Sequence, residues 1–135
     1  MTANISFRIE NDILLCFVTG ERGCGSVLEY WQKLINKCHQ EDIQLVQITL
    51  ALRGKFNPFD AIESYQSIIE MVKPTSLKIA TVDLNHLSAS DTQVSCKMGA
   101  SQGLDVAYFD SEDAAKEWLI EGVTSDGSED IEKLA

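Results

Sequence analysis

The chain has 135 residues, 44% of them hydrophobic, so it can bury one core of ordinary size without disulfides or metals. Its formal net charge of -10 at pH 7 argues against nucleic acid or an anionic membrane surface as a general partner. No stretch approaches the roughly 20 apolar residues of a membrane-spanning helix, and residues 1–10 hold no long apolar run. We therefore expect no transmembrane segment and a cytoplasmic protein.

The apolar runs continue to Leu119 without a linker rich in Pro, Gly or Ser. We therefore expect a single domain over residues 1–121. Residues 122–135 are acidic and hold too little apolar surface to offset the entropy lost on ordering, so they are expected to form a flexible tail.

Short apolar runs alternate with stretches of helical periodicity along the chain. Strands are predicted over residues 5–9, 13–19, 43–52, 77–84 and 104–109. Helices are predicted over residues 27–39, over 58–73, behind Ser88, and behind a cap at Asp110 or Ser111. Only the first two strands are close enough to form a hairpin, because parallel neighbours need a helical crossover. The predicted fold class is α/β: a mixed five-stranded sheet, mainly parallel, with one antiparallel N-terminal edge strand and four helices.

Two details of the pattern predict how the layers pack. The third strand has an apolar side and a side that carries Gln47 and Thr49, so we expect the helices to cover mainly one face of the sheet. Ser88 and Asp91 have the spacing of a capping box. The helix behind them is weakly apolar, and Val94 and Met98 are its best expected core anchors.

Several stretches together resemble one bacterial family. They are the hairpin over residues 5–20, the helix that ends near His39, the strands over 44–50 and 78–82, and the segment 109–119, Phe-Asp-Ser-Glu-Asp-Ala-Ala-Lys-Glu-Trp-Leu. This pattern, over about residues 5 to 121, resembles an uncharacterised branch of the SpoIIAA-like family, in the STAS and SEC14-like group. The matching motifs are structural and not catalytic.

The resemblance implies a non-enzymatic regulatory or protein-interaction module. Anti-sigma factor antagonists of the STAS group carry a phosphorylatable serine directly after an aspartate, at the start of the helix that follows the central strand. Here the corresponding loop runs from Asn57 to Ile62, and Ala61 follows Asp60, so the phosphorylation switch does not carry over. Ser64, one turn further on, is not expected to replace that serine.

Ligands of open α/β sheets lie outside the carboxyl ends of the strands, where three loops of this chain should meet. The candidate ligand-binding residues in these loops are Arg22, Cys24, Arg53, Lys55, Asp60, Asn85 and His86. Arg53 and Lys55 precede a helix N-terminus, a place that favours an anion, although the more ordinary role of such residues is to solvate an exposed loop or to pair with Asp60. Cys24 lies near Arg22 and a helix start, which favours a reactive thiol.

No pattern assigns a reaction or a cofactor. The loop from Gly20 to Gly25 matches neither a dinucleotide-binding fingerprint nor a phosphate-binding loop. The two histidines and four cysteines lack metal-ligand spacing. We expect no metal, no cofactor and no catalytic residue, with an enzyme built on the Cys24 and His86 loops as one alternative.

The second alternative is a binder or carrier of a small hydrophobic, lipid-like molecule. A partly covered sheet face beside Ile62, Tyr65 and the weakly amphipathic third helix would hold it. The resemblance extends to SEC14-like proteins, which bind such molecules.

We also expect a homodimer, besides a possible regulatory protein partner. Four aromatic residues exceed what the helix stripes and caps require, and exposed aromatic residues favour interfaces. They are Tyr30, Phe56, Phe59 and Tyr65. The second helix, or the loop before it, would form the interface.

Overall fold

The computed structural model describes the backbone of residues 3–21, 24–54 and 58–124, and the side chains of residues 3–21, 27–54 and 64–121. Strands and helices alternate after an opening hairpin. The elements are β1 (Ala3–Glu10), β2 (Ile13–Glu21), α1 (Cys24–Glu41), β3 (Leu45–Arg53), α2 (Pro58–Val72), β4 (Lys78–Asp83), α3 (Ala89–Ser101), β5 (Asp105–Phe109) and α4 (Glu112–Thr124).

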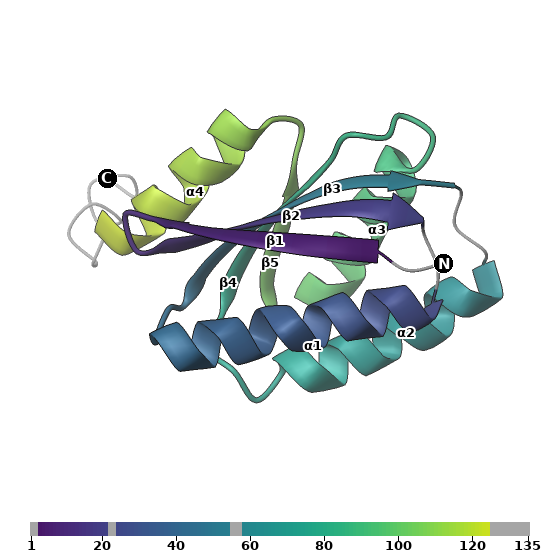
Figure 1. Cartoon of the computed structure of the whole chain (residues 1–135), viewed down its shortest axis with the longest axis horizontal. Helices are drawn as coiled ribbons and strands as arrows, with labels where there is room; N and C mark the ends of the chain where they lie inside the picture. The colour runs from purple at the N-terminus through teal and green to yellow at the C-terminus, as the bar shows by residue number, and fades with distance from the viewer. Residues whose placement is uncertain (1–2, 22–23, 55–57, 125–135) are drawn as a thin grey trace.

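The five strands form one sheet in the order β1-β2-β3-β4-β5 (Figure 1). β1 pairs antiparallel with β2 at one edge, and the remaining neighbours are parallel. Asn11 and Asp12 make the two-residue turn between β1 and β2 with φ values of 52° and 64°. Such left-handed turns match the twist of a hairpin, and Asn and Asp tolerate them better than most residues. The predicted mixed sheet with an antiparallel N-terminal edge strand is confirmed.

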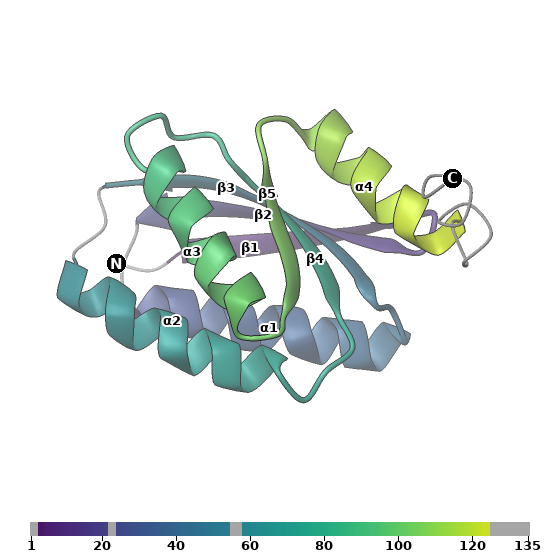
Figure 2. The same cartoon turned by 180° about the vertical axis from the view of Figure 1, so that it is seen from behind.

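Three helices cover one face of the sheet and α4 covers the other. α1 and α2 lie side by side below the sheet in Figure 1, and Figure 2 shows α3 alongside β5. The larger core fills the space between the sheet and the helices α1 and α2, and it includes Leu34, Ile48 and Ile79. A smaller core beneath α4 includes Val82 and Leu119. The expectation that helices pack mainly on one face agrees with this arrangement.

The third strand is buried on both sides. Gln47 is 3% exposed and Thr49 is 1% exposed, because the first turn of α4 lies over the polar side of β3. α1 begins at Cys24 and ends at Glu41, so it is longer at both ends than the predicted 27–39 helix. α4 continues to Thr124, into the segment 122–135 expected as a tail, and residues 125–135 lie outside the described part.

The buried side of α3 differs from the prediction. Val94 and Met98 are 55% and 40% exposed, whereas the buried residues of the helix are Thr92, Cys96 and Gly99. The two expected anchors are therefore wrong: small and polar side chains face the sheet, and the large apolar ones face solvent. None of the described helices is both long and apolar enough to span a membrane.

The two predicted helix caps have different outcomes. The hydroxyl of Ser111 accepts a hydrogen bond from the backbone N–H of Ala114 at 3.1 Å, as expected of an N-cap. Ser88 stands at the start of α3 but makes no capping bond, because its hydroxyl donates to Asp83. The capping box predicted from Ser88 and Asp91 is therefore wrong, although the helix begins where it was expected.

The aromatic residues behind the homodimer expectation are not all at the surface. Tyr30 is 4% exposed and belongs to the larger core, so the expectation that it supplies interface area is wrong. Tyr65 is half-buried. The side chains of Phe56 and Phe59 lie outside the described residues.

Candidate functional site

Seven site residues were predicted at the carboxyl ends of the strands. Three of them have described side chains: Arg53, Asn85 and His86. Arg53 ends β3, and its Nε lies 2.8 Å from Oε2 of Glu21 in an exposed ion pair. Asn85 follows β4; its Nδ2 donates to the carbonyl of Leu52 at 2.9 Å. His86 is exposed. The sheet thus brings Arg53 and Asn85 to the same edge, as the topology predicted.

The amide of Asn85 holds its own loop. Besides the bond to Leu52, its Oδ1 accepts a hydrogen bond from the backbone N–H of Leu87 at 2.9 Å. Cys24 and Asp60 lie in the first turns of α1 and α2, but nothing is described of their side chains. Arg22 and Lys55 lie outside the described residues. A ligand-binding role for this group of seven stays a prediction.

A buried carboxylate organises the same edge. Asp83, at the end of β4, is 7% exposed. Its oxygens accept hydrogen bonds from the hydroxyl of Thr92 at 2.6 Å, the hydroxyl of Ser88 at 2.9 Å and the backbone N–H of Asn85 at 2.9 Å. Hydrogen bonds to an ionised acceptor are shorter and stronger than neutral ones. Asp83 therefore fixes the loop after β4 and the first turn of α3.

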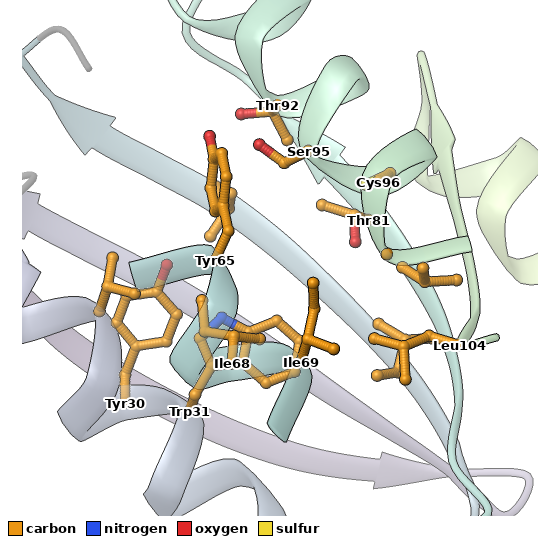
Figure 3. Close-up of a pocket in the computed structure, with 15 residues that line it drawn as sticks. Tyr30, Trp31, Tyr65, Ile68, Ile69, Thr81, Thr92, Ser95, Cys96 and Leu104 are labelled. Carbon is orange, nitrogen blue, oxygen red and sulfur yellow. The ribbon is translucent and has the colours of Figure 1, made fainter. Parts of the chain in front are cut away.

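A cavity lies between the three helices on one face and the sheet beneath them. Its volume is about 100 Å³, and it is partly open to solvent. The lining residues come from α1, α2, α3, β3, β4, β5 and the turn before β5: Val27, Tyr30, Trp31, Leu50, Tyr65, Ile68, Ile69, Ile79, Thr81, Thr92, Ser95, Cys96, Gly99, Leu104 and Val106. In Figure 3 the hydroxyls of Tyr65, Thr92 and Ser95 lie toward the same end of the cavity.

The polar groups of α3 and β4 in this lining already have partners within the protein. Thr92 donates to Asp83, and Ser95 donates to the carbonyl of Asp91 at 2.9 Å. Thr81 shares a hydrogen bond with the thiol of Cys96. Because these hydrogen bonds are satisfied, the cavity presents chiefly methyl groups, methylenes and aromatic rings to anything that enters it.

The size of the cavity limits its occupant. An engineered apolar cavity of about 150 Å³ in another protein holds a benzene molecule, whereas sites for drug-sized ligands measure about 300–1,000 Å³. A cavity of about 100 Å³ suits the end of a hydrocarbon chain or a small ring. It does not enclose a whole lipid.

The cavity exists because α3 contributes small side chains where a core helix would carry large ones. Thr92, Ser95, Cys96 and Gly99 lie along its lining. Tyr65 and the weakly amphipathic α3, from which the sequence predicts a hydrophobic site, both belong to the cavity. The side chain of Ile62, predicted for the same site, lies outside the described residues. Trp31 and Leu104 were not predicted to line it, because contacts between distant elements leave no local pattern.

The described thiols are poor nucleophiles and poor metal ligands. Burial raises the pKa of Cys38 and of Cys96 to about 11, and it raises the pKa of Cys16 still further. These thiols are protonated at neutral pH, whereas the thiolate is the reactive form. Within the described side chains, no group of three His, Cys, Asp or Glu residues is arranged to hold a metal ion.

Comparison with known proteins finds a likeness in structure. No family model matches the chain, and no curated protein matches it. One similar solved structure is that of an uncharacterised protein of the DUF3478 family, with a SpoIIAA-like fold, from Shewanella loihica PV-4. The two share 12% identity at a TM-score of 0.51, over 87% of this chain and 94% of the other. At that identity the likeness extends to the fold alone, and this chain adopts a SpoIIAA-like fold.

Proposed function

We propose that the protein is a non-enzymatic binding module that holds a small hydrophobic group in the cavity between α1, α2 and α3. The group is a small ring or the end of a hydrocarbon chain. The observation that carries this proposal is the cavity of about 100 Å³, whose lining is mostly apolar and whose α3 and β4 polar groups bond within the protein.

The energy available to such a ligand is modest. A benzene-sized molecule that buries its surface in the cavity gains about 25 cal/mol for each Å² of apolar area removed from water. After the loss of translational freedom, we expect a dissociation constant of about 0.1–1 mM for a ring alone. A longer hydrocarbon chain gains further where it follows the half-buried side chains of Trp31, Tyr65 and Ile68 at the surface.

Trp31 supplies a direct readout, since its indole lines the cavity. Trp118 lies on the opposite face of the sheet, against Phe109 at a ring-centroid distance of 5.3 Å. In a Trp118→Phe variant, Trp31 is the only source of indole fluorescence, which excitation at the red edge of the absorption band separates from that of the tyrosines. Bromobenzene, whose heavy atom quenches indole fluorescence on contact, should then quench it with a saturable dose response. Purely linear quenching, of the kind that collisions in solution produce, would contradict the proposal.

Two substitutions in α3 locate the binding. Ser95→Leu replaces a hydroxymethyl group of the cavity lining with the larger isobutyl group and should abolish saturable quenching. Gln93→Leu also introduces a leucine, at an exposed position of the same helix, and should leave the quenching intact. Equal loss in both variants would mean that α3, and not the cavity, had been perturbed. Native mass spectrometry of protein purified without detergent would then reveal any retained hydrophobic molecule.

The state of the buried thiols supports the non-enzymatic part of the proposal. The raised pKa values of Cys16, Cys38 and Cys96 disfavour nucleophilic catalysis by these thiols. The rival is an enzyme that uses the loops of Cys24 and His86. A catalytic turnover found by broad activity screening and abolished by Cys24→Ser or His86→Ala would overturn the proposal.

A further inference from the structure

A second cavity lies on the opposite face of the sheet, beside α4, and the proposed function makes no use of it. Its volume is about 420 Å³, within the range of about 300–1,000 Å³ typical of small-molecule sites. Its floor is formed by side chains of β1, β2 and β3: Ser6, Arg8, Leu15, Phe17, Gln47 and Thr49. α4 adds Glu112, Asp113 and Lys116 at one side. We call this the α4-side cavity.

The register of the strands explains why this floor is continuous. Phe17 pairs with Ser6 of β1 and with Thr49 of β3. Leu15 pairs in the same way with its neighbours on β1 and β3, and partners across a sheet share one face. α4 packs over β3, β4 and β5, so the ring of Phe17 on β2 stays 41% exposed.

Gln47 gives the α4-side cavity a polar group that has no partner. The side chain is 3% exposed, and its Oε1 is buried without a hydrogen bond to any described residue. A buried acceptor without a donor is unfavourable, and such groups are rare in folded proteins. Gln47 is one of the residues that line the cavity, and the broad terminal torsion of glutamine lets its carboxamide adjust to a ligand there. A ligand that donates a hydrogen bond there removes the penalty.

The charges around the cavity favour a cation. Lys116 and Arg8 both pair with Glu10, at 2.8 Å and 3.6 Å. Glu112 accepts the hydroxyl of Thr49 at 2.9 Å, whereas no described residue forms an ion pair with Asp113. Both cations of the lining are thus already paired with Glu10, whereas the carboxylate of Asp113 keeps its charge for a ligand. The net charge of the whole chain, -10, also raises the local concentration of cations.

We propose that the α4-side cavity binds a small primary ammonium compound with an apolar body. The ammonium group donates hydrogen bonds to Oε1 of Gln47 and to the carboxylate of Asp113. The apolar body lies on Leu15 and on Phe17, whose side chain is 41% exposed. This site lies on the opposite side of the sheet from the hydrophobic cavity, so it is independent of the proposed function.

Calorimetric titration with three matched probes tests the chemistry. 2-Phenylethylamine carries an ammonium at neutral pH, 2-phenylethanol is neutral, and 3-phenylpropionate is an anion. We expect the amine to bind at least about tenfold more tightly than the alcohol, because charge-assisted hydrogen bonds are stronger than neutral ones. Equal affinity for the amine and the alcohol, or no heat from the amine at millimolar concentration, would overturn the proposal.

Two variants then locate the ammonium group. Gln47→Met keeps the volume of the side chain but removes the unpaired acceptor, so it should weaken amine binding about tenfold and also raise Tm. Asp113→Asn, at an exposed position, should weaken binding about fivefold. Gln44→Met, at an exposed position just before β3, is the matched control and should change neither quantity.

The result for Gln47→Met separates a binding role from a structural one. If Gln47 serves only the fold, its replacement lowers Tm and leaves the amine affinity unchanged. If that variant does not fold, Asp113→Asn decides: unchanged affinity there overturns the proposal. Ser95→Leu, which fills the hydrophobic cavity, should leave amine binding intact, so failure of one site is distinguishable from failure of the other.

Discussion

Asp83 shows how much one side chain contributes at the carboxyl edge of the sheet. Its buried carboxylate accepts hydrogen bonds from Thr92, Ser88 and the backbone of Asn85. These bonds hold the loop after β4 against the start of α3, which in turn supplies one wall of the hydrophobic cavity. Loss of one donor leaves an oxygen of a buried anion less well satisfied.

Removal of the Thr92 hydroxyl should therefore destabilise the protein. Thr92→Val keeps the shape of the side chain but deletes the 2.6 Å hydrogen bond to Asp83. We expect a loss of about 1.5–3 kcal/mol in the free energy of unfolding, the usual value for a hydrogen bond to a charged group. Urea denaturation measures this as a lower midpoint at an unchanged slope. Thr92→Ser keeps the hydroxyl and should lose less; equal losses in the two variants would contradict this view.

The four cysteines should differ in their rate of alkylation: one thiol should react fast and three slowly. Cys16, Cys38 and Cys96 are buried, and their raised pKa values keep them protonated at neutral pH. Cys24 is predicted from the sequence to be reactive. With iodoacetamide in the native state, we expect one alkylation that Cys24→Ser abolishes, and three more only after unfolding. Mass spectrometry of the intact protein counts the additions, and fast labelling of Cys96 would contradict its burial.

α3 is the element on which sequence analysis and structure differ most. Val94 and Met98 are large apolar residues of α3 and were therefore expected to be its core anchors. The helix instead buries Thr92, Cys96 and Gly99. The reason is close approach: a Cβ added to Gly99 would lie 3.2 Å from Cγ1 of Val106 and 3.4 Å from Cδ1 of Leu104. Hydrophobic periodicity detects bulk, and a helix that packs through small residues gives it no signal.

Gly99→Ala tests whether this packing can adjust. Alanine is favoured over glycine within a helix by about 1 kcal/mol. Val106 and Leu104 both line the hydrophobic cavity, so they have room to move by a few tenths of an ångström. We expect a net gain in stability of up to about 1 kcal/mol in thermal or urea unfolding. Ala100→Gly, at the exposed neighbouring position, measures the helix-propensity contribution alone, and a less stable Gly99→Ala would show that the contact is rigid.

The strand and helix order was predictable because it follows from local patterns. Each signal lies within a few residues of the turn or helix end that it determines. Examples are the hairpin turn at Asn11 and Asp12, the proline at the start of α2 and the cap at Ser111. The sites depend on contacts between distant segments. The hydrogen bond of Thr49 with Glu112 joins residues 63 positions apart, and no pattern along the chain predicts it. For the same reason the sequence predicted a loop cluster and part of the hydrophobic cavity, but not the α4-side cavity.

At the scale of the whole molecule, the homodimer stays a prediction, and its expected surface changes. Tyr30 is buried and Tyr65 lines the hydrophobic cavity, so neither offers a free aromatic face. Sedimentation at micromolar concentration measures the mass directly. We still expect a two-fold dimer, the commonest symmetric assembly. A species of one chain mass that persists as the concentration rises would contradict it.

The ion pair of Glu10 with Lys116 connects the first strand to the last helix. The ammonium of Lys116 lies 2.8 Å from Oε1 of Glu10. This hydrogen bond, the positive charge of Lys116 and, to a lesser degree, that of Arg8 lower the pKa of Glu10 below its usual value. Glu10 therefore binds its proton less readily in the folded chain than in the unfolded one. Its contribution to stability is present above the unfolded pKa of about 4.3 and is lost as the pH falls through the lower, folded pKa.

The stability difference between wild type and Glu10→Gln should follow that sign. We expect wild type to have the higher urea midpoint at pH 7 and the difference to shrink as the medium is acidified below about pH 4. Both side chains are partly exposed, so 1 M salt should also reduce the difference. In a Lys116→Met background the pH-dependent part should be small, because only the weaker effect of Arg8 is left. If the difference at pH 3 equals that at pH 7, Glu10 stabilises the chain through packing and not through its charge.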